Sequence, residues 1–309
     1  YEILMMARIC TAIVSGVTLS TVMTFINDII PQEQAPRIIS FVYAGFSVAS
    51  VLGTPVGALL SDAFGIKAAF VAVEAVALLV TILLLVSVPR SGSTDVSSKV
   101  RDQLVILKDR RIILVLVMKA FGMAATYVFY VYVTPILEDS VGLSVWMVGL
   151  VLFFYGGATI VSNLGSGSLA QRYGLGKLPI MFALQAVVLA LLGLSLVSGN
   201  TLLCIINVVL TGVFIYHMNA PLQSYLLQVS AKDYPRALTL ASAVMPTSSD
   251  VGIATGSFLG GVVATNLGFV WSGPIGAILA VVSVIAAFMI LQPESRMGGS
   301  LRSRLRYRK

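Results

Sequence analysis

Five ionisable side chains lie inside long apolar stretches of this sequence, where a charge is costly. They are Arg8, Glu74, Lys119, His217 and Asp250. An ionisable residue inside a membrane usually pairs with another group or lines a polar cavity, and it commonly marks the route of an ion or a solute. Side chains of these types can bind and release a proton or hold a charged group. The pattern therefore indicates a polar path through an otherwise apolar protein.

The five residues differ in what they could do. Asp250 lies near the middle of its apolar stretch and is the best carboxylate for a proton site. His217 is the single histidine, and it is a minor candidate for proton relay because histidine ordinarily titrates near neutrality. A lone histidine is more often a satisfied core residue. Lys119 and Arg8 could instead extend their charges to the membrane surface, and an Arg8–Glu74 pair is conceivable.

Tyrosine and asparagine side chains on the same stretches could line a solute cavity with ring faces and amide groups. Aromatic residues at helical spacing are alternatively packing residues or members of an interfacial belt. The cavity candidates are Tyr127, Tyr130, Tyr155, Asn207, Tyr216 and Asn219.

The elements that must position these residues are membrane-spanning helices. The chain is 58% hydrophobic and 11% charged, whereas a soluble domain carries about 25% charged residues. Apolar stretches long enough to cross a bilayer core of about 30 Å predict an all-α membrane protein with about nine transmembrane helices. They cover residues 3–25, 38–60, 67–88, 112–136, 145–166, 178–198, 201–224, 237–263 and 270–291.

The net charge of +7 comes from cations in alternate short loops and in the C-terminal tail. This bias predicts that those loops and the C-terminus face the cytoplasm, with Tyr1 outside. Cations at membrane edges contact anionic lipid heads, so membrane lipids are expected partners and nucleic acid is not. Residues 100–107, in the longest connection, have the apolar spacing of a helix on the membrane surface.

A glycine pattern occurs twice in the chain. Gly53 and Gly57 have the same spacing as Gly256 and Gly260, and a Pro-Arg pair precedes each set. Small residues one turn apart permit close helix packing in a membrane, while Pro55 removes a backbone hydrogen bond. The glycines therefore form either static packing faces or a bending seam between two halves.

The duplication predicts a protein of twelve helices in two parallel six-helix halves, of which this chain holds helices 4 to 12. Residues 1–88 would be the second part of the N-terminal half, and residues 89–111 a cytoplasmic central linker. Residues 112–309 would form the C-terminal half with its basic cytoplasmic tail.

Several motifs carry a family resemblance. Residues 167–174, Gly-Ser-Leu-Ala-Gln-Arg-Tyr-Gly, are similar to the loop motif Gly-x-Leu-Ala-Asp-Arg-x-Gly, with Gln171 at the acidic position. Residues 53–57, Gly-Thr-Pro-Val-Gly, are similar to the antiporter motif of the fifth helix, and Arg8 lies at the position of the fourth-helix arginine of the same proteins. The chain resembles the major facilitator superfamily and, within it, drug:proton antiporters of the arabinose-efflux-permease type.

The resemblance implies a secondary transporter that moves a small sugar-like or drug-like solute out of the cell by alternating access, driven by protons. It implies a multi-pass protein of the cell inner membrane, here expected as a monomer without cofactor or metal. Arg8 would take part in proton coupling. Arg172, with Gly167 and Gly174, would form a tight cytoplasmic turn that holds the inward gate.

Other functions remain as alternatives. The same fold could act as a facilitator or a symporter, or survive as a membrane protein that transports nothing. An intramembrane enzyme would need paired aspartates, His-Glu-x-x-His or Gly-x-Ser-x-Gly beside a histidine, so an enzyme is not expected. Cys10 and Cys204 lie in apolar runs without metal-site spacing. No phosphate-binding Gly-x-x-x-x-Gly-Lys motif occurs, which favours an ion gradient as the energy source.

Overall fold

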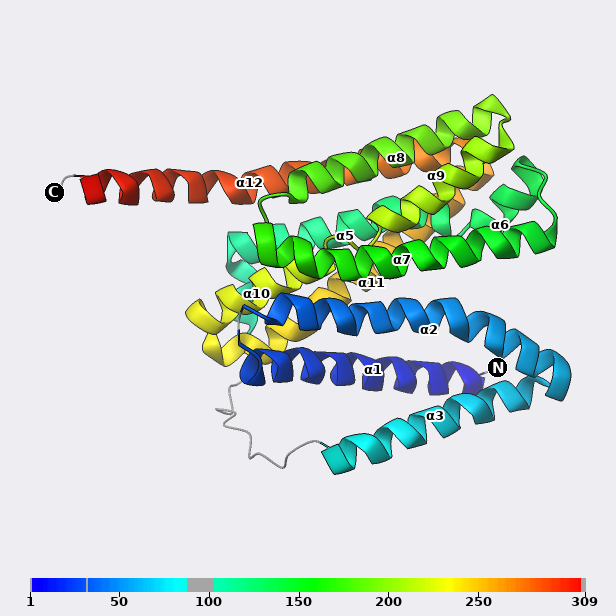
Figure 1. The fold of residues 1–309 in the computed structure, drawn as a ribbon, viewed down its shortest axis with the longest axis horizontal. Coiled ribbons are helices and arrows are strands. Elements are labelled where there is room, and N and C mark those ends of the chain that lie inside the picture. The colour runs from blue at the N-terminus through cyan, green and yellow to red at the C-terminus, as the bar shows by residue number, and fades with distance from the viewer. Residues whose placement is uncertain (1, 32, 88–102, 307–309) are drawn as a thin grey trace.

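The computed structural model describes residues 2–31, 33–87 and 103–306, and these residues form helices and connecting turns without a β-strand (Figure 1). Some side chains within the helices, including those of Arg8 and Pro55, lie outside the described part. The long helices are α1 (Glu2–Ile29), α2 (Ala35–Phe64), α3 (Ile66–Ser87), α5 (Arg110–Tyr130), α7 (Val145–Tyr173), α8 (Leu178–Ser198), α9 (Thr201–Phe214), α10 (Asn219–Asp233), α11 (Leu238–Asn266) and α12 (Ser272–Arg306).

Each predicted span corresponds to one of these helices, with α9 and α10 as two parts of one span. Within the described residues, seven segments are long and apolar enough to cross a membrane. α11 is not one of them, because it carries several polar residues together with Pro246 and Asp250. In α1 the apolar segment found is shorter and covers Val14–Met23.

The predicted span 201–224 is broken in the structure. Helix α9 ends at Phe214 and α10 begins at Asn219, and the backbone N–H of Tyr216 donates to Oγ of Ser162 on α7 at 3.0 Å. The Ser162 side chain on a neighbouring helix therefore replaces a regular helical hydrogen bond. The side chains between α9 and α10 do not follow the regular helical arrangement.

Shorter elements complete the chain. Of the predicted surface helix at residues 100–107, residues 100–102 lie outside the described residues, and Leu104–Lys108 forms a short 3-10 helix with Ile106 buried. Val133–Pro135 and a wide helical turn at Ile136–Ser140 follow α5, and short 3-10 turns at Pro235–Ala237 and Phe269–Trp271 precede α11 and α12.

One end of the bundle carries the connections after α1, α7 and α10, together with Arg37, Arg111, Arg172 and Arg236; we call it the basic end (Figure 1). Here α1 and α2 pack against the later helices. The residues of this basic-end cluster are Met23, Ile26, Ile39, Tyr43, Ala170, Ala220 and Leu227. Gly167 of α7 lies so close to α2 that a Cβ there would come within 2.2 Å of Ser40 Oγ.

The two copies of the glycine pattern have different surroundings. A Cβ on Gly256 or Gly260 of α11 would come within 2.5 Å or 2.4 Å of a carbonyl oxygen of α5, and Gly252 is equally close to that helix. Gly53 and Gly57 of α2 have no atom of the described residues within 4 Å of such a Cβ. The second copy is therefore a tight helix–helix contact between α11 and α5.

Candidate functional site

A cavity of about 320 Å³ lies near the middle of the bundle, between α1 and α2 on one side and α5, α7, α10 and α11 on the other. We call it the central cavity. Its polar lining residues are Ser15, Tyr43, Lys119, Asn163, Tyr216, Asn219, Ser249 and Asp250. It is the meeting point of the early and late helices of the chain.

Lys119 is the most deeply buried charged residue of this cavity, with 1% of its surface exposed. Its ammonium group donates a hydrogen bond to Oδ1 of Asn219 and lies 5.6 Å from the centre of the Tyr43 ring. A cation with so little water contact needs partners of this kind, because burial of an unpaired charge is strongly unfavourable. Lys119 therefore points inward and does not reach the membrane surface.

Asn219 connects Lys119 to the early helices through further hydrogen bonds. Its Nδ2 donates to Oδ1 of Asn163 at 2.6 Å, and Nδ2 of Asn163 donates to Oγ of Ser47 at 2.7 Å and to the backbone oxygen of Tyr43 at 3.2 Å. These residues form one continuous set of hydrogen bonds from α5 through α10 and α7 to α2. We call it the Lys119 network.

Asp250 lines the same cavity from α11, one turn after Pro246, and its carboxylate and the Lys119 amine influence each other electrostatically. No direct ion pair joins these two described side chains. A carboxylate and an amine that share a cavity without direct contact leave room for a solute or water between them.

Four predicted tyrosines lie together beside the cavity. Tyr216 lines it, and Tyr216 and Tyr127 influence each other electrostatically. The Tyr127 and Tyr130 rings meet edge to face at 5.5 Å, and Tyr130 stacks on Tyr155 at 4.9 Å. Because Tyr127 and Tyr130 belong to the last turns of α5, this aromatic row leads from the cavity away from the basic end. Asn207 is buried but does not line the cavity.

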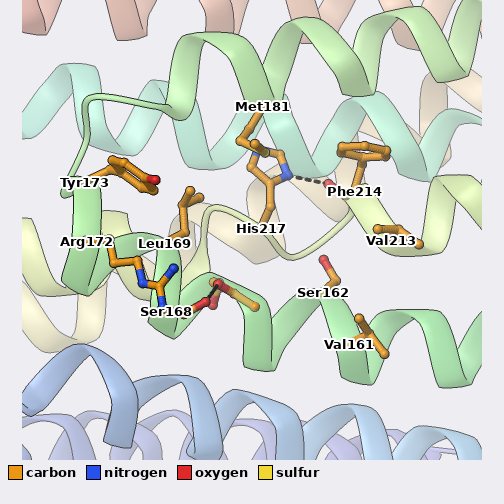
Figure 2. Close-up of a pocket in the computed structure, with 12 residues that line it drawn as sticks. Val161, Ser162, Ser168, Leu169, Arg172, Tyr173, Met181, Val213, Phe214 and His217 are labelled. Carbon is orange, nitrogen blue, oxygen red and sulfur yellow. Dashed lines mark hydrogen bonds between the residues drawn. The ribbon is translucent and has the colours of Figure 1, made fainter.

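The remaining predicted charges lie elsewhere. Glu74 is exposed on α3, which packs against α2 at the edge of the bundle (Figure 1). The side chain of Arg8 is outside the described part. His217 belongs to the break between α9 and α10, and its ring meets the Phe182 ring edge to face at 4.9 Å. It lines a second pocket between α7 and α8, shown in Figure 2, together with the exposed Arg172.

The predicted turn at the end of α7 forms with Gly174 at a φ of +54°, a conformation that favours glycine. Next to Arg172, Gln171 donates from Nε2 to the backbone oxygen of Glu33 at 3.2 Å. Gln171, which stands where the family motif has an aspartate, thus contacts the connection between α1 and α2. Arg172 points into the second pocket (Figure 2).

Several residues of the site were not among the predicted ones. Tyr43, Ser47 and Asn163 belong to the Lys119 network, and Gln223 accepts from the Tyr43 hydroxyl at 3.3 Å. Asn163 and Gln223 could have been predicted, because an amide side chain within an apolar stretch of sequence is as easily recognised as a charged one. Tyr43 and Ser47 carried no such signal.

A separate polar cluster ties α5 to α10 at the basic end. Asp109 caps α5 by accepting from the backbone N–H of Arg111 at 2.8 Å, and Nη2 of Arg111 also reaches Oδ2 of Asp233 at 2.6 Å. The Tyr234 hydroxyl donates to Oδ2 of Asp109 at 3.1 Å. The hydrogen bonds from Arg111 lower the pKa of the Asp109 carboxyl below its ordinary value of 3.8.

We expect Asp109→Ala to lower the stability of the purified protein by about 1–2 kcal/mol, mainly through loss of the helix cap, since partly exposed ion pairs contribute little. The exposed Asp139→Ala serves as the control.

The lowered pKa of Asp109 also predicts a pH dependence. The ionised carboxylate stabilises the folded protein at pH values above the pKa that Asp109 has in the unfolded chain, and this stabilisation is lost as the pH falls through the lower pKa of the folded state. The difference between wild type and Asp109→Asn in thermal unfolding should therefore be present at pH 7 and shrink below about pH 4. Equal melting of both proteins at pH 7 would contradict this role.

The comparisons with known proteins agree with this architecture. The family model of the Major Facilitator Superfamily matches residues 1–245. An uncharacterized MFS-type transporter of Bacillus subtilis, YtbD, is 32% identical over 284 residues, which cover 92% of this chain and 71% of that protein. A probable sugar efflux transporter of Mannheimia succiniciproducens is 26% identical over 300 residues, covering 96% of this chain and 73% of the relative.

The inner membrane transport protein YdhP of Escherichia coli K12 is 24% identical over 298 residues, covering 96% and 75% of the two chains. Among solved structures, a bacterial homologue of the iron transporter ferroportin in the outward-facing state superimposes with a TM-score of 0.68 at 14% identity, covering 90% of this chain and 69% of that one. This likeness concerns the fold. The multi-pass helical architecture and the match over most of the sequence identify the chain as a transporter, not an enzyme, that belongs to the major facilitator superfamily.

Proposed function

We propose that this protein is a proton-coupled efflux transporter that carries a small solute through the central cavity. The observation that supports the proposal most is the buried ammonium group of Lys119, which shares the cavity with Asp250 and connects to α2 through the Lys119 network. Ionisable groups kept at this depth are costly, and they persist in transporters as proton or ion sites.

The cavity suits a small polar solute with an apolar face. Asn219 and Asn163 offer amide groups, and Tyr216 begins the aromatic row. A volume of about 320 Å³ is at the lower end of the range of about 300–1,000 Å³ that is usual for small-molecule sites. A solute of the size of a sugar fits this space, and the printed description of the Mannheimia relative concerns sugar efflux.

Coupling follows if proton and solute favour different states of one protein. A proton on Asp250 or Lys119 changes the charge of the cavity that the solute must enter, so each ligand alters the affinity for the other. The two access states would differ at the basic-end cluster, where α1 and α2 meet α7 and α10. A ligand shifts such an equilibrium only by its difference in affinity for the two states.

The proposal includes an orientation and a domain plan. The basic end would face the cytoplasm, because cationic loops remain on that side. The basic-end cluster would then lie on the inside, and the aromatic row would lie on the route to the outside. Residues 1–88 would be part of an N-terminal six-helix half and residues 112–309 the C-terminal half. The uncontacted Gly53 and Gly57 are compatible with a further helix that packs on α2 as α5 packs on α11.

Asp250→Asn should uncouple transport from pH. In everted membrane vesicles, we expect its pH-gradient-driven uptake of labelled sugars or ethidium to fall by about tenfold or more, which is within the usual range of coupling between two ligands. Movement down a solute gradient should persist. Asp139→Asn, an exposed carboxylate far from the cavity, is the control. An unchanged pH profile of the Asp250 variant would remove this residue from the mechanism.

A further inference from the structure

The hydrogen bonds of the Lys119 network all run in one direction, from α5 to α2. An ammonium group can only donate, so Asn219 turns its Oδ1 toward Lys119 and its Nδ2 toward Asn163. Asn163 accepts at Oδ1 and donates from Nδ2 to Ser47 and to the backbone oxygen of Tyr43, which can only accept. The two ends of the network therefore fix the orientation of both amides.

Asn163 lies within the contact between α2 and α7, which run side by side (Figure 1). Toward the basic end, a Cβ on Gly167 of α7 would collide with Ser40 of α2, and farther from it a Cβ on Gly156 would collide with Val51. At a rise of about 1.5 Å per residue, the two glycines are about 16 Å apart along α7. Asn163 lies between them, is 1% exposed, and donates its hydrogen bonds across this contact. We call it the α2–α7 contact.

The α2–α7 contact controls access to the central cavity. The cavity lies between α1 and α2 on one side and the later helices on the other, so a route to the basic end opens when α2 moves away from α7. This movement breaks both hydrogen bonds that Asn163 donates to α2. Because each lost hydrogen bond costs free energy, the Lys119 network stabilises the closed basic end.

The bonding of Lys119 decides whether the network is complete. While Lys119 donates to Asn219, Nδ2 of Asn219 faces Oδ1 of Asn163. When the ammonium group turns to another acceptor in the cavity, the Asn219 amide can rotate, and a rotated amide sets its oxygen against that of Asn163. The charged and titratable groups near Lys119 are Asp250 on α11, His217 in the break before α10, and Tyr43 on α2.

We infer that Asn163 is a positioning residue through which Lys119 on α5 holds α2 against α7. The oriented amides of Asn219 and Asn163 transmit the bonding of Lys119 to the α2–α7 contact, so a change of partner at Lys119 makes the basic end easier to open. The acceptors in the cavity that compete with Asn219 for the ammonium group are Asp250 and the oxygen atoms of a bound solute. This role rests on the proposed transport function, because opening matters only to a protein that alternates between two access states.

The test measures the distance between the basic ends of α2 and α7 by double electron–electron resonance, in the full-length protein in lipid nanodiscs and without solute. The spin labels are attached at Glu33→Cys and Lys177→Cys, two exposed positions, in protein from which the other cysteines have been removed. We expect a short distance to predominate without further substitution. Asn163→Ala should raise the ratio of long to short distances about tenfold, because the hydrogen bonds to α2 are lost. An unchanged ratio in folded Asn163→Ala would overturn the inference.

Gln185→Ala is the matched control. Gln185 is also a 1% exposed amide, and its Nε2 donates to the backbone oxygen of Gly122 and to Oγ1 of Thr126, both at 2.9 Å. These bonds join α8 to α5 and do not reach α2. Gln185→Ala should therefore lower the temperature of thermal unfolding, as Asn163→Ala does, and leave the distance unchanged. An equal shift of the distance in both variants would mean that the opening reflects general loosening of the protein.

Two further variants distinguish positioning from simple packing. Asn219→Asp keeps an acceptor for Lys119 but removes the donor to Asn163, so it should open the α2–α7 contact as Asn163→Ala does. Lys119→Met should also open it, and the double variant with Asn163→Ala should open it no further, because both substitutions interrupt one network. Additive effects, or a closed contact in folded Asn219→Asp, would contradict the inference.

The distances without solute and the uptake into vesicles can fail separately. Shifted distances in a protein that takes up no solute would keep the role of Asn163 in the closed contact and remove the transport proposal. Unshifted distances in a protein with gradient-driven uptake would keep the transport proposal and remove the role of Asn163.

Discussion

Lys119→Met should abolish gradient-driven transport while the protein still inserts and folds. We expect the initial rate of proton-driven solute uptake into everted vesicles to fall by about 100-fold, the upper part of the usual range of coupling. The reason is that the substitution removes the one fully buried cation of the Lys119 network and leaves Asp250 without its electrostatic partner. The measurement is uptake per amount of inserted protein, determined by quantitative immunoblotting.

The design of this variant separates chemistry from folding. Met fills a volume similar to that of Lys, and replacing a buried charge by a well-packed apolar side chain is often neutral for stability or even stabilising. Lys177→Met, an exposed lysine at the basic end, is the matched control and should transport as wild type does. If Lys119→Met kept the wild-type rate and pH dependence, the amine would be a structural cation only, and the proposed coupling site would be wrong.

Gly256→Leu should produce the largest loss of stability among the substitutions considered. A Cβ at this position would come within 2.5 Å of the carbonyl oxygen and 2.9 Å of the Cα of Ala124. These are backbone atoms, so the clash cannot be relieved by turning a side chain, and α11 and α5 must separate. Overpacking of this kind typically costs about 1–3 kcal/mol and occasionally more, and we expect a value at or above the upper limit.

Gly157→Leu on α7 is the matched control, because a Cβ there meets no described atom within 4 Å. The measurement is thermal unfolding of both variants in detergent, together with the yield of monodisperse protein. Because α5 carries Lys119, residual folded Gly256→Leu should also transport poorly. Equal unfolding temperatures of the two leucine variants would show that the close contact between α11 and α5 is not a source of stability.

The helices could be predicted because a lipid environment leaves few choices. Backbone groups must satisfy one another inside a membrane, so an apolar stretch of sufficient length is a helix. The ends of the helices were harder to predict. α7 continues to Tyr173, beyond the predicted residue 166, because the polar segment after Ser166 stays helical up to Gly174. The break after Phe214 depends on a bond from Ser162, a residue remote in sequence, and no local signal marked it.

The candidate site was predictable in part. Lys119, Tyr216, Asn219 and Asp250 do line the central cavity, since polar groups on apolar helices have few other places to lie. The rotation of each helix was not predictable, because faces toward lipid and toward protein are similarly apolar. His217, predicted as a minor candidate for proton relay, lies in the second pocket and not in the central cavity, because the helix is broken between Phe214 and Asn219.

The central claim is that a pH gradient drives a solute through the cavity. It is tested most directly by following labelled sugars and ethidium into everted vesicles that contain the protein, with the gradient imposed and then collapsed by a protonophore. Our account predicts that at least one solute accumulates above its external concentration and is released when the gradient collapses. Movement that is equally fast without the gradient, or no movement of any solute beyond that in vesicles lacking the protein, would contradict it.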